Sequence, residues 1–302
     1  MSKLLQVLVI GVITGSIYGF IAIGMVLVYR TTGVLNVAHG GIGILSGYIA
    51  YEMIHFRHQP YYLGLASGVA TACLLGFLFE LIVVRRLPGR PDLQTAATLG
   101  LYVLLLGVVV TVPWWVTSSS VQVLPSPLVN KTVRIPGTLQ VVTYDQIVLM
   151  AALAVVSGGL YWMLRRTRIG LAMRAVSDSS EAAGLMGIKP EVVSRVLWVM
   201  GFALSGLTTM LIVPITLLDS TTLSLLTLKA LTVAFIGGLV SLPLTVAGGM
   251  ILGCLEVAND LYLVSLPDLK YAWPFILMVV VLLRRSTERR RSVIDDAPVV
   301  AA

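Results

Sequence analysis

Charged residues are scarce in this sequence, and their scarcity limits the class of protein. Asp, Glu, Lys and Arg make up 12% of the 302 residues, hydrophobic residues make up 57%, and mean hydropathy is +0.95. Several stretches carry no Asp, Glu, Lys or Arg, among them residues 4–29, 95–130, 196–218 and 230–255. Each is long enough to cross a bilayer, which takes roughly 20 apolar residues in a helix. Because backbone groups cannot stay unpaired in lipid, we expect an all-α integral membrane protein.

Residues suited to catalysis or metal binding are also few. The two cysteines, Cys73 and Cys254, lie in apolar sequence, where a cysteine usually acts as a small hydrophobic residue. His39, His55 and His58 have no Cys or acidic partner at metal-ligand spacing. The sequence has no Gly-Lys dipeptide, which excludes a Walker loop for ATP. We therefore expect no enzymatic activity, cofactor or metal site within this chain.

The basic residues gather at the ends of apolar stretches and indicate which loops face the cytoplasm. Net charge is +7, but this distribution follows the positive-inside rule and does not point to nucleic acid. It places loops 85–94 and 165–191 inside and a proline-containing, turn-rich loop at 118–142 outside, with the N-terminus outside as well. Residues 1–285 then form the transmembrane domain, and 286–302 form a basic, disordered cytoplasmic tail.

Apolar stretches and their boundaries predict a bundle of about eight or nine transmembrane helices. The second stretch is short and is expected to be an ordinary span, a broken helix or a re-entrant segment. The seventh and eighth could instead form one interrupted hairpin. The predicted spans are 4–29, 41–56, 61–84, 95–117, 143–164, 192–217, 223–240, 243–260 and 270–284.

Loop 165–191 contains start and stop signals for a short helix. Asp178 can cap its first turn, and Glu181, three residues later, completes a capping box. Gly187 can end the helix in the left-handed conformation, and Pro190 prevents its continuation. A helix of about two turns is too short to be stable alone, so we expect it to pack on the bundle or on a partner. Helix-forming residues occupy its interior: Ala182, Ala183, Leu185 and Met186.

Small residues recur every four positions on the first span. Gly11, Gly15 and Gly19 share one face, and Gly249 and Gly253 repeat the spacing later in the chain. Small faces let helices approach closely. We expect tight packing within the subunit, and the alternative is that these faces let helices slide or rotate during transport.

Acidic residues within the apolar sequence would suggest ion-coupled transport. Glu52, Glu80, Glu256 and Asp260 all lie near predicted span ends, and no mid-span Lys or Arg is identified as a partner for them. We expect these acids to reach the interface or to cap helices, and Glu256 is the one whose depth could be functional. This pattern argues against ion coupling.

Several motifs together resemble one family. Glu181-Ala182-Ala183, three residues and Gly187 resemble the EAA loop of importer-type ABC permeases. In order along the chain, VLNVAHG (34–40), RTRIGLAMRA (166–175), KALTVAFIGGLVSLP (229–243) and GGMILG (248–253) resemble the branched-chain amino-acid (LIV-type) permeases. The resemblance implies a permease subunit with a second, similar permease, two cytoplasmic ATPases that bind ATP and Mg, an extracytoplasmic solute-binding protein and a location in the bacterial cytoplasmic membrane.

The resemblance also implies roles for individual residues. Glu181, Ala182, Ala183, Leu185 and Gly187 would couple the chain to the ATPases. The solute would be a branched-chain or other amino acid, urea or an amide, and Val37 and Gly41 depart from the family pattern in a way that leaves this choice open.

Polar groups beside apolar sequence are candidates for the translocation path, namely Thr14, Asn36 and His39. The alternative for Asn36 and His39 is a structural role, in which their side chains are hydrogen-bonded and close a turn. For the whole chain, the alternative functions are an ion-coupled carrier or facilitative channel, and a membrane scaffold that moves no solute.

Overall fold

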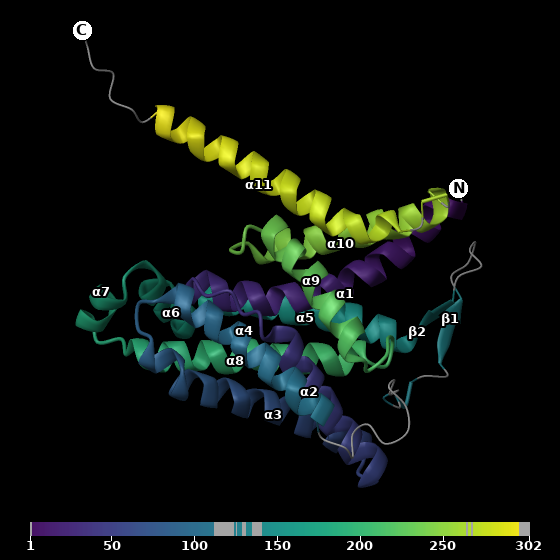
Figure 1. The fold of residues 1–302 in the computed structure, drawn as a ribbon, viewed down its shortest axis with the longest axis horizontal. Helices are drawn as coiled ribbons and strands as arrows, with labels where there is room; N and C mark the ends of the chain where they lie inside the picture. Colours follow the sequence, from purple (N-terminus) through teal and green to yellow (C-terminus); the bar gives the residue numbers. More distant parts are fainter. Residues whose placement is uncertain are drawn as a thin grey trace.

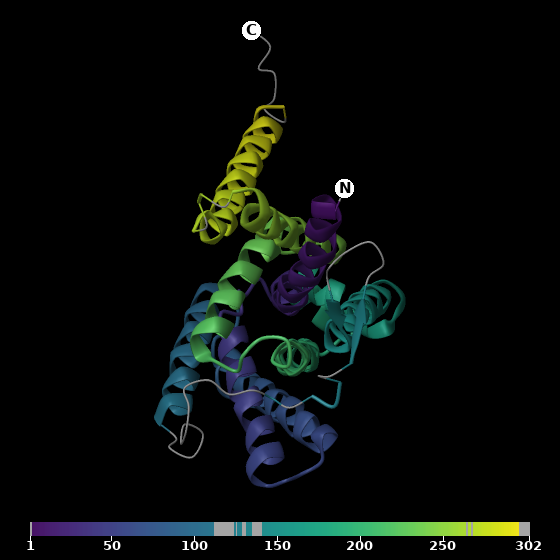
Figure 2. The ribbon, with the colours of Figure 1, turned by 90° about the vertical axis from the view of Figure 1, so that its right-hand side faces the viewer.

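The structure is a computed structural model of a helical bundle (Figures 1 and 2). It describes residues 2–111, 124, 126–128, 131–134, 141–263, 265–266 and 268–295. The first part of the chain contains α1 (Ser2–Thr32), α2 (His39–Tyr51), the π-helix η1 (Glu52–Phe56), α3 (Tyr61–Ile82), the 3-10 helix η2 (Val84–Arg86) and α4 (Pro91–Thr111). The second part contains β1 (Thr132–Arg134), β2 (Val141–Thr143), α5 (Tyr144–Arg166), α6 (Arg168–Asp178), α7 (Ser180–Leu185), α8 (Pro190–Ile212), α9 (Ser220–Ile236), α10 (Leu242–Tyr262) and α11 (Leu269–Asp295).

Six described helices are long and apolar enough to cross a membrane: α1, α3, α4, α5, α8 and α10. Each lies on a predicted span. The predicted spans 41–56, 223–240 and 270–284 also overlap helices, but α2, α9 and α11 are not among these six. Helix α2 has 13 residues and α9 has 17, or roughly 20 and 26 Å at 1.5 Å per residue. In α11 the uncharged stretch runs only from Tyr271 to Leu283.

Helix α1 lies at the centre of the bundle and packs closely along α10. A Cβ on Gly15 would lie 2.5 Å from the carbonyl oxygen of Gly249, and one on Gly11 would lie 2.6 Å from Cα of Cys254. Only glycine permits this approach of two backbones. The tight packing predicted from the four-residue glycine spacing is therefore confirmed.

A second apolar cluster joins α2, α3, α4 and α8. Its centre is an aromatic group in which the rings of Phe79, Trp198 and Phe202 have centroids 5.0 to 5.8 Å apart. Trp198 and Phe202 are fully buried. This cluster fixes α3 against α8, and thereby sets the position of the segment that precedes α8.

The chain re-enters the bundle between α1 and α2. A Cβ on Gly24 would overlap the imidazole of His39, so α2 begins beside a residue roughly 12 Å before the end of α1. The returning segment is extended, and Thr95 and Thr98 of α4 bond to its backbone at Leu35 and Val37. This arrangement agrees with the broken or re-entrant alternative for 41–56.

The two ends of the bundle differ. In Figure 1, α6 and α7 lie at one end, whereas the N-terminus and the strands lie at the other. The pairing of β1 with β2 was not predicted. It pairs Thr132, inside the loop 118–142, with Thr143, the residue that follows the loop. Much of the loop lies outside the described residues. Helix α11 continues to Asp295, so the tail expected to be disordered from 286 begins as helix.

Candidate functional site

Helices α6 and α7 form a capped pair at one end of the bundle. Thr167 caps α6 by accepting a hydrogen bond from Gly170 N at 3.1 Å, and Ser179 caps α7 by accepting one from Ala182 N at 3.2 Å. The prediction that Asp178 caps the short helix is wrong, because Asp178 is the last residue of α6. The extended backbone needed at a cap falls one residue later, at Ser179.

The predicted end of the short helix is confirmed. Gly187 has φ +83°, the left-handed conformation that favours glycine. Its amide donates to the Gly184 carbonyl at 3.0 Å, and the Ile188 amide donates to the Ala183 carbonyl at 3.1 Å. Pro190 then begins α8, where its missing N–H costs no hydrogen bond.

The exposed side of α7 is apolar at its tip. Leu185 is 91% exposed and Met186 is 83% exposed, although both are large apolar side chains. Glu181 and Ala182 are also exposed, whereas Ala183 is buried against the rest of the chain. Two adjacent apolar side chains at a polar end of the bundle are typical of a protein-protein contact.

An ion-pair network anchors α8 next to this pair of helices. Glu80 of α3 is 1% exposed, and its carboxylate lies 3.2 Å from Arg195 Nε and 3.6 Å from Arg85 Nε. The expectation that Glu80 reaches the interface or caps a helix is wrong. Arg195 and Arg85 approach it from α8 and η2, so a buried carboxylate is paired with both. A cavity of about 420 Å³ adjoins Glu80, Ser180 and Glu191.

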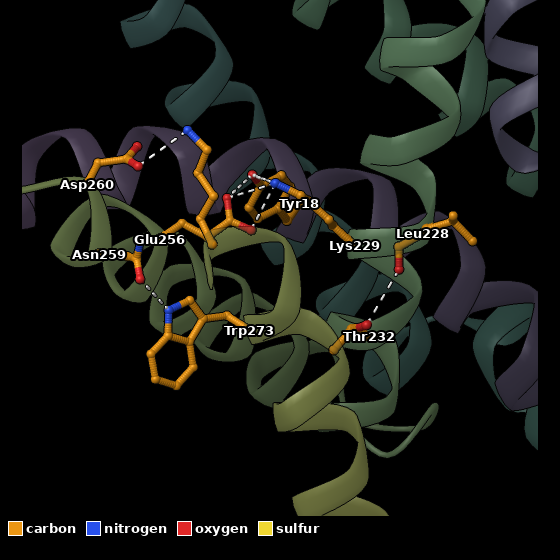
Figure 3. A network of polar contacts seen from close by, with 9 residues as sticks. Tyr18, Leu228, Lys229, Thr232, Glu256, Asn259, Asp260 and Trp273 are labelled. Carbon is orange, nitrogen blue, oxygen red and sulfur yellow. Dashed lines mark hydrogen bonds and ion pairs between the residues drawn. The ribbon is translucent and has the colours of Figure 1, made fainter. Parts of the chain in front are cut away.

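A second ion pair lies inside the bundle among α1, α9, α10 and α11 (Figure 3). Lys229 Nζ lies 2.9 Å from both carboxylate oxygens of Glu256. The Tyr18 hydroxyl donates to Glu256 at 2.6 Å and accepts from Lys229 at 3.2 Å. The Lys229 ammonium also lies 5.3 and 5.7 Å from the ring centroids of Tyr18 and Tyr271.

This pair corrects the statement that the intramembrane acids have no mid-span basic partner. Lys229 is the tenth residue of the 17-residue α9, and it falls within the predicted span 223–240. The sequence signal for this ion pair was a lysine, Lys229, in one apolar span and a glutamate, Glu256, in the next. The sequence places Lys229 directly before the uncharged stretch 230–255, which makes it look like a boundary residue.

Further polar contacts link α10 and α11 beyond this pair. Lys270 Nζ lies 3.3 Å from Asp260, and the Trp273 indole donates to Asn259 at 3.2 Å. Asn259 also donates to the carbonyl of Leu266 at 3.2 Å. Polar side chains therefore continue from Glu256 to the loop that joins the two helices.

The three residues predicted for the translocation path are separated by the fold. Thr14 lies half-buried on α1. Asn36 and His39 are buried at 0% and 2% exposure, and their side-chain nitrogens and the amide oxygen have no hydrogen-bond partner in the described part of the chain. The satisfied role expected for these two side chains is therefore not observed. The Ser205 hydroxyl donates to the backbone carbonyl of His39 instead.

The space beside His39 is small. A cavity of about 10 Å³ lies there among hydroxyl groups of α8 and α9, including Ser205, Thr208 and Thr227. Its volume is about that of a single water-sized probe. An amino acid does not fit there in this conformation, and the path assignment of Asn36 and His39 stays a prediction.

Comparisons with known proteins bear on the whole chain. Residues 7–282 match the family model described as branched-chain amino acid transport system / permease component. The chain is 28% identical over 262 residues to the high-affinity branched-chain amino acid transport system permease protein BraD of Pseudomonas aeruginosa, which covers 83% of this chain and 85% of the relative. It is 27% identical to the corresponding LivH protein of Salmonella typhimurium, with coverage of 86% and 87%.

Similar proteins also occur outside bacteria. A probable branched-chain amino acid transport permease protein LivH of Methanocaldococcus jannaschii is 26% identical, covering 84% of this chain and 80% of the relative. Among solved structures, PsaBC from Streptococcus pneumoniae in complex with Fab matches with a TM-score of 0.46 at 15% identity, covering 92% of this chain and 90% of that chain. The family match spans nearly all of the sequence, and the chain is therefore a multi-pass membrane protein that belongs to the family of branched-chain amino acid transport system permease components.

Proposed function

We propose that this chain is the permease subunit of an importer that moves amino acids across the cytoplasmic membrane, driven by ATP hydrolysis in separate subunits. Family membership supports the permease role. One observation supports the external motor: the exposed α7 tip, with Leu185 at 91% and Met186 at 83% exposure on a helix of six residues. So short a helix is unstable alone, and its apolar tip gains stability from a partner that covers it.

In this mechanism the α6–α7 pair transmits movement from the motor to the bundle. The motor is a pair of cytoplasmic ATPases that bind ATP and Mg. Glu181, Ala182 and Leu185 meet the ATPase, Ala183 holds α7 to the bundle, and Gly187 sets the exit direction of the chain. Beyond Gly187, α8 carries the movement into the membrane through its packing on α3.

The complete transporter contains three further kinds of subunit. A second permease, identical or homologous, forms the other wall of the solute path, and two ATPases lie on the cytoplasmic side. A solute-binding protein delivers the solute from outside. The positions of α6 and α7 opposite the N-terminus (Figure 1) support a topology with α7 inside and the N-terminus outside.

Two measurements test this proposal. Leu185→Cys in a variant lacking Cys73 and Cys254 is labelled with a membrane-impermeant maleimide in right-side-out and inside-out vesicles. We expect labelling in inside-out vesicles only, and labelling from outside would refute the assignment. Reconstitution with the second permease, the ATPases and the binding protein should give leucine uptake that requires ATP.

A second candidate function is an ion-coupled carrier, which the buried pair of Lys229 and Glu256 favours. Such a protein would accumulate solute by itself in response to a proton or sodium gradient. Gradient-driven uptake by the reconstituted chain without ATPases would identify the carrier, and its absence together with ATP-driven uptake by the complex would exclude it.

A further inference from the structure

Several charged residues on α9, α10 and α11 are partly exposed at the surface of the chain. Side-chain exposure is 17% for Lys229, 32% for Lys270 and 49% for Asp260, and Tyr271 beside them is 53% exposed. Charged side chains at membrane depth face the interior of a protein or water, because exposure to hydrocarbon is costly. Asp260 and Lys270 lie at the ends of α10 and α11, whereas Lys229 lies in the middle of α9, and its partial exposure favours an aqueous path or a protein partner beside it.

The ion pair also joins two helices that follow each other along the chain. Lys229 belongs to α9 and Glu256 to α10, and the sharp turn between these helices contains Gly238 and Leu239, which both have positive φ. Tyr18 of α1 donates to Glu256 and accepts from Lys229. Tyr18 therefore contacts both members of the pair from a third helix.

We propose that Lys229 and Glu256 form a recognition site for a zwitterionic solute, in which the Lys229 ammonium binds the solute carboxylate and the Glu256 carboxylate binds the solute ammonium. This inference rests on the proposed transport function. It selects among the solutes that the sequence leaves open, which are amino acids, urea and amides.

Charge balance gives the selectivity. Opening a buried ion pair leaves two charges without partners, which is strongly unfavourable. A zwitterion with ammonium and carboxylate on one carbon replaces both partners at once and leaves no charge unpaired. A cation such as leucinamide or an anion such as 4-methylpentanoate satisfies one side chain and leaves the other, and urea supplies no charge for either. The site therefore favours amino acids.

The test removes both charges together. Lys229→Met with Glu256→Gln leaves no unpaired charge, whereas either single change would. A second variant, Lys229→Gln with Glu256→Gln, keeps two groups that can hydrogen-bond to each other and is used if the first inserts poorly. The matched control is Arg57→Met with Glu52→Gln, which removes the ion pair of 3.7 Å between Arg57 Nε and Glu52 in the segment that follows α2.

Uptake is measured with radiolabelled leucine in proteoliposomes that contain the complete complex. We expect both Lys229/Glu256 double variants to lose at least about tenfold in leucine uptake while ATP hydrolysis stays within about twofold, since two charge-assisted hydrogen bonds to the solute are lost. The control should keep its ratio of uptake to ATP hydrolysis.

Thermal unfolding of the detergent-solubilised chain provides a readout independent of transport. We expect leucine to raise Tm of the wild type and of the control, and not of the Lys229/Glu256 variants, because a ligand stabilises the state that binds it. Leucinamide, 4-methylpentanoate and urea should give no such shift.

Three results overturn the proposal. They are leucine uptake that is unchanged in the Lys229/Glu256 variants, an equal Tm shift with leucinamide or 4-methylpentanoate, and no shift of the wild type with leucine. A wild-type complex that takes up no amino acid with ATP instead refutes the transport function itself.

Discussion

The end of α7 offers a sharp test, because one backbone angle controls it. Gly187 has φ +83°, and no heavy atom lies within 4 Å of the position that its Cβ would occupy. A Cβ at this position therefore meets no neighbour, and the backbone conformation is what resists the change. For a residue other than glycine the left-handed conformation costs roughly 1–2 kcal/mol, and a β-branched residue lies at the upper end.

This energy converts directly into weaker docking if the ATPase binds α7 with its native end formed. A cost of about 1–2 kcal/mol corresponds to roughly 5- to 30-fold in the binding constant. We expect Gly187→Val to weaken association with the ATPase subunits by about that factor. Gly187→Asn should lose much less, because asparagine tolerates the left-handed conformation.

The control is Gly184→Ala on the same helix. Gly184 also has no heavy atom within 4 Å of its Cβ position, and it has a helical backbone. Alanine there should maintain or strengthen docking, by up to about 1 kcal/mol. Affinity is measured by titrating ATPase subunits onto the solubilised chain. Equal losses for Gly187→Asn and Gly187→Val would contradict the conformational argument, and so would wild-type affinity in Gly187→Val.

Three further outcomes follow from other contacts. Leu185→Ser should weaken ATPase binding while Tm stays within a degree or two, since the side chain is 91% exposed; a large drop in Tm would show that Leu185 supports the fold. Gly15→Leu should disrupt the packing of α1 on α10 and reduce the amount of folded protein. Gly107→Ala should leave that amount unchanged, because no heavy atom lies within 4 Å of the Cβ position at Gly107. Glu80→Gln alone should destabilise the chain by roughly 1–3 kcal/mol, because the buried carboxylate loses its charge-assisted bond to Arg195, which is itself 31% exposed. An unchanged denaturation midpoint would refute the ion pair.

Much of the architecture was predictable from the sequence because lipid imposes one strong rule. Every predicted span overlaps a helix within its described residues, since an apolar stretch in a membrane must satisfy its backbone internally. The glycine spacing on α1 also predicted close packing, and Gly187 ended the short helix as expected. These are local properties, in which a residue and its neighbours along the chain contain the information.

The partners of charged and polar groups could not be predicted in this way. Glu256 and Lys229 are 27 residues apart, and Tyr18 reaches the same carboxylate from α1, so only the packing of α1 against α9 and α10 brings them together. Glu80 and Arg195 meet for the same reason, through the contact of α3 with α8. The cap of α7 shifted by one residue because α6, which was not predicted, takes Asp178.

The sequence by itself determined that this chain is a membrane-embedded helical protein, where its longest helices lie and to which family it is similar. Tertiary structure alone decided which charges are neutralised inside the bundle, how deeply α2 begins and which side of α7 is free. The physical reason is that hydrophobic patterning acts along a helix, whereas ion pairs and close backbone contacts depend on distances between helices that are far apart in the chain.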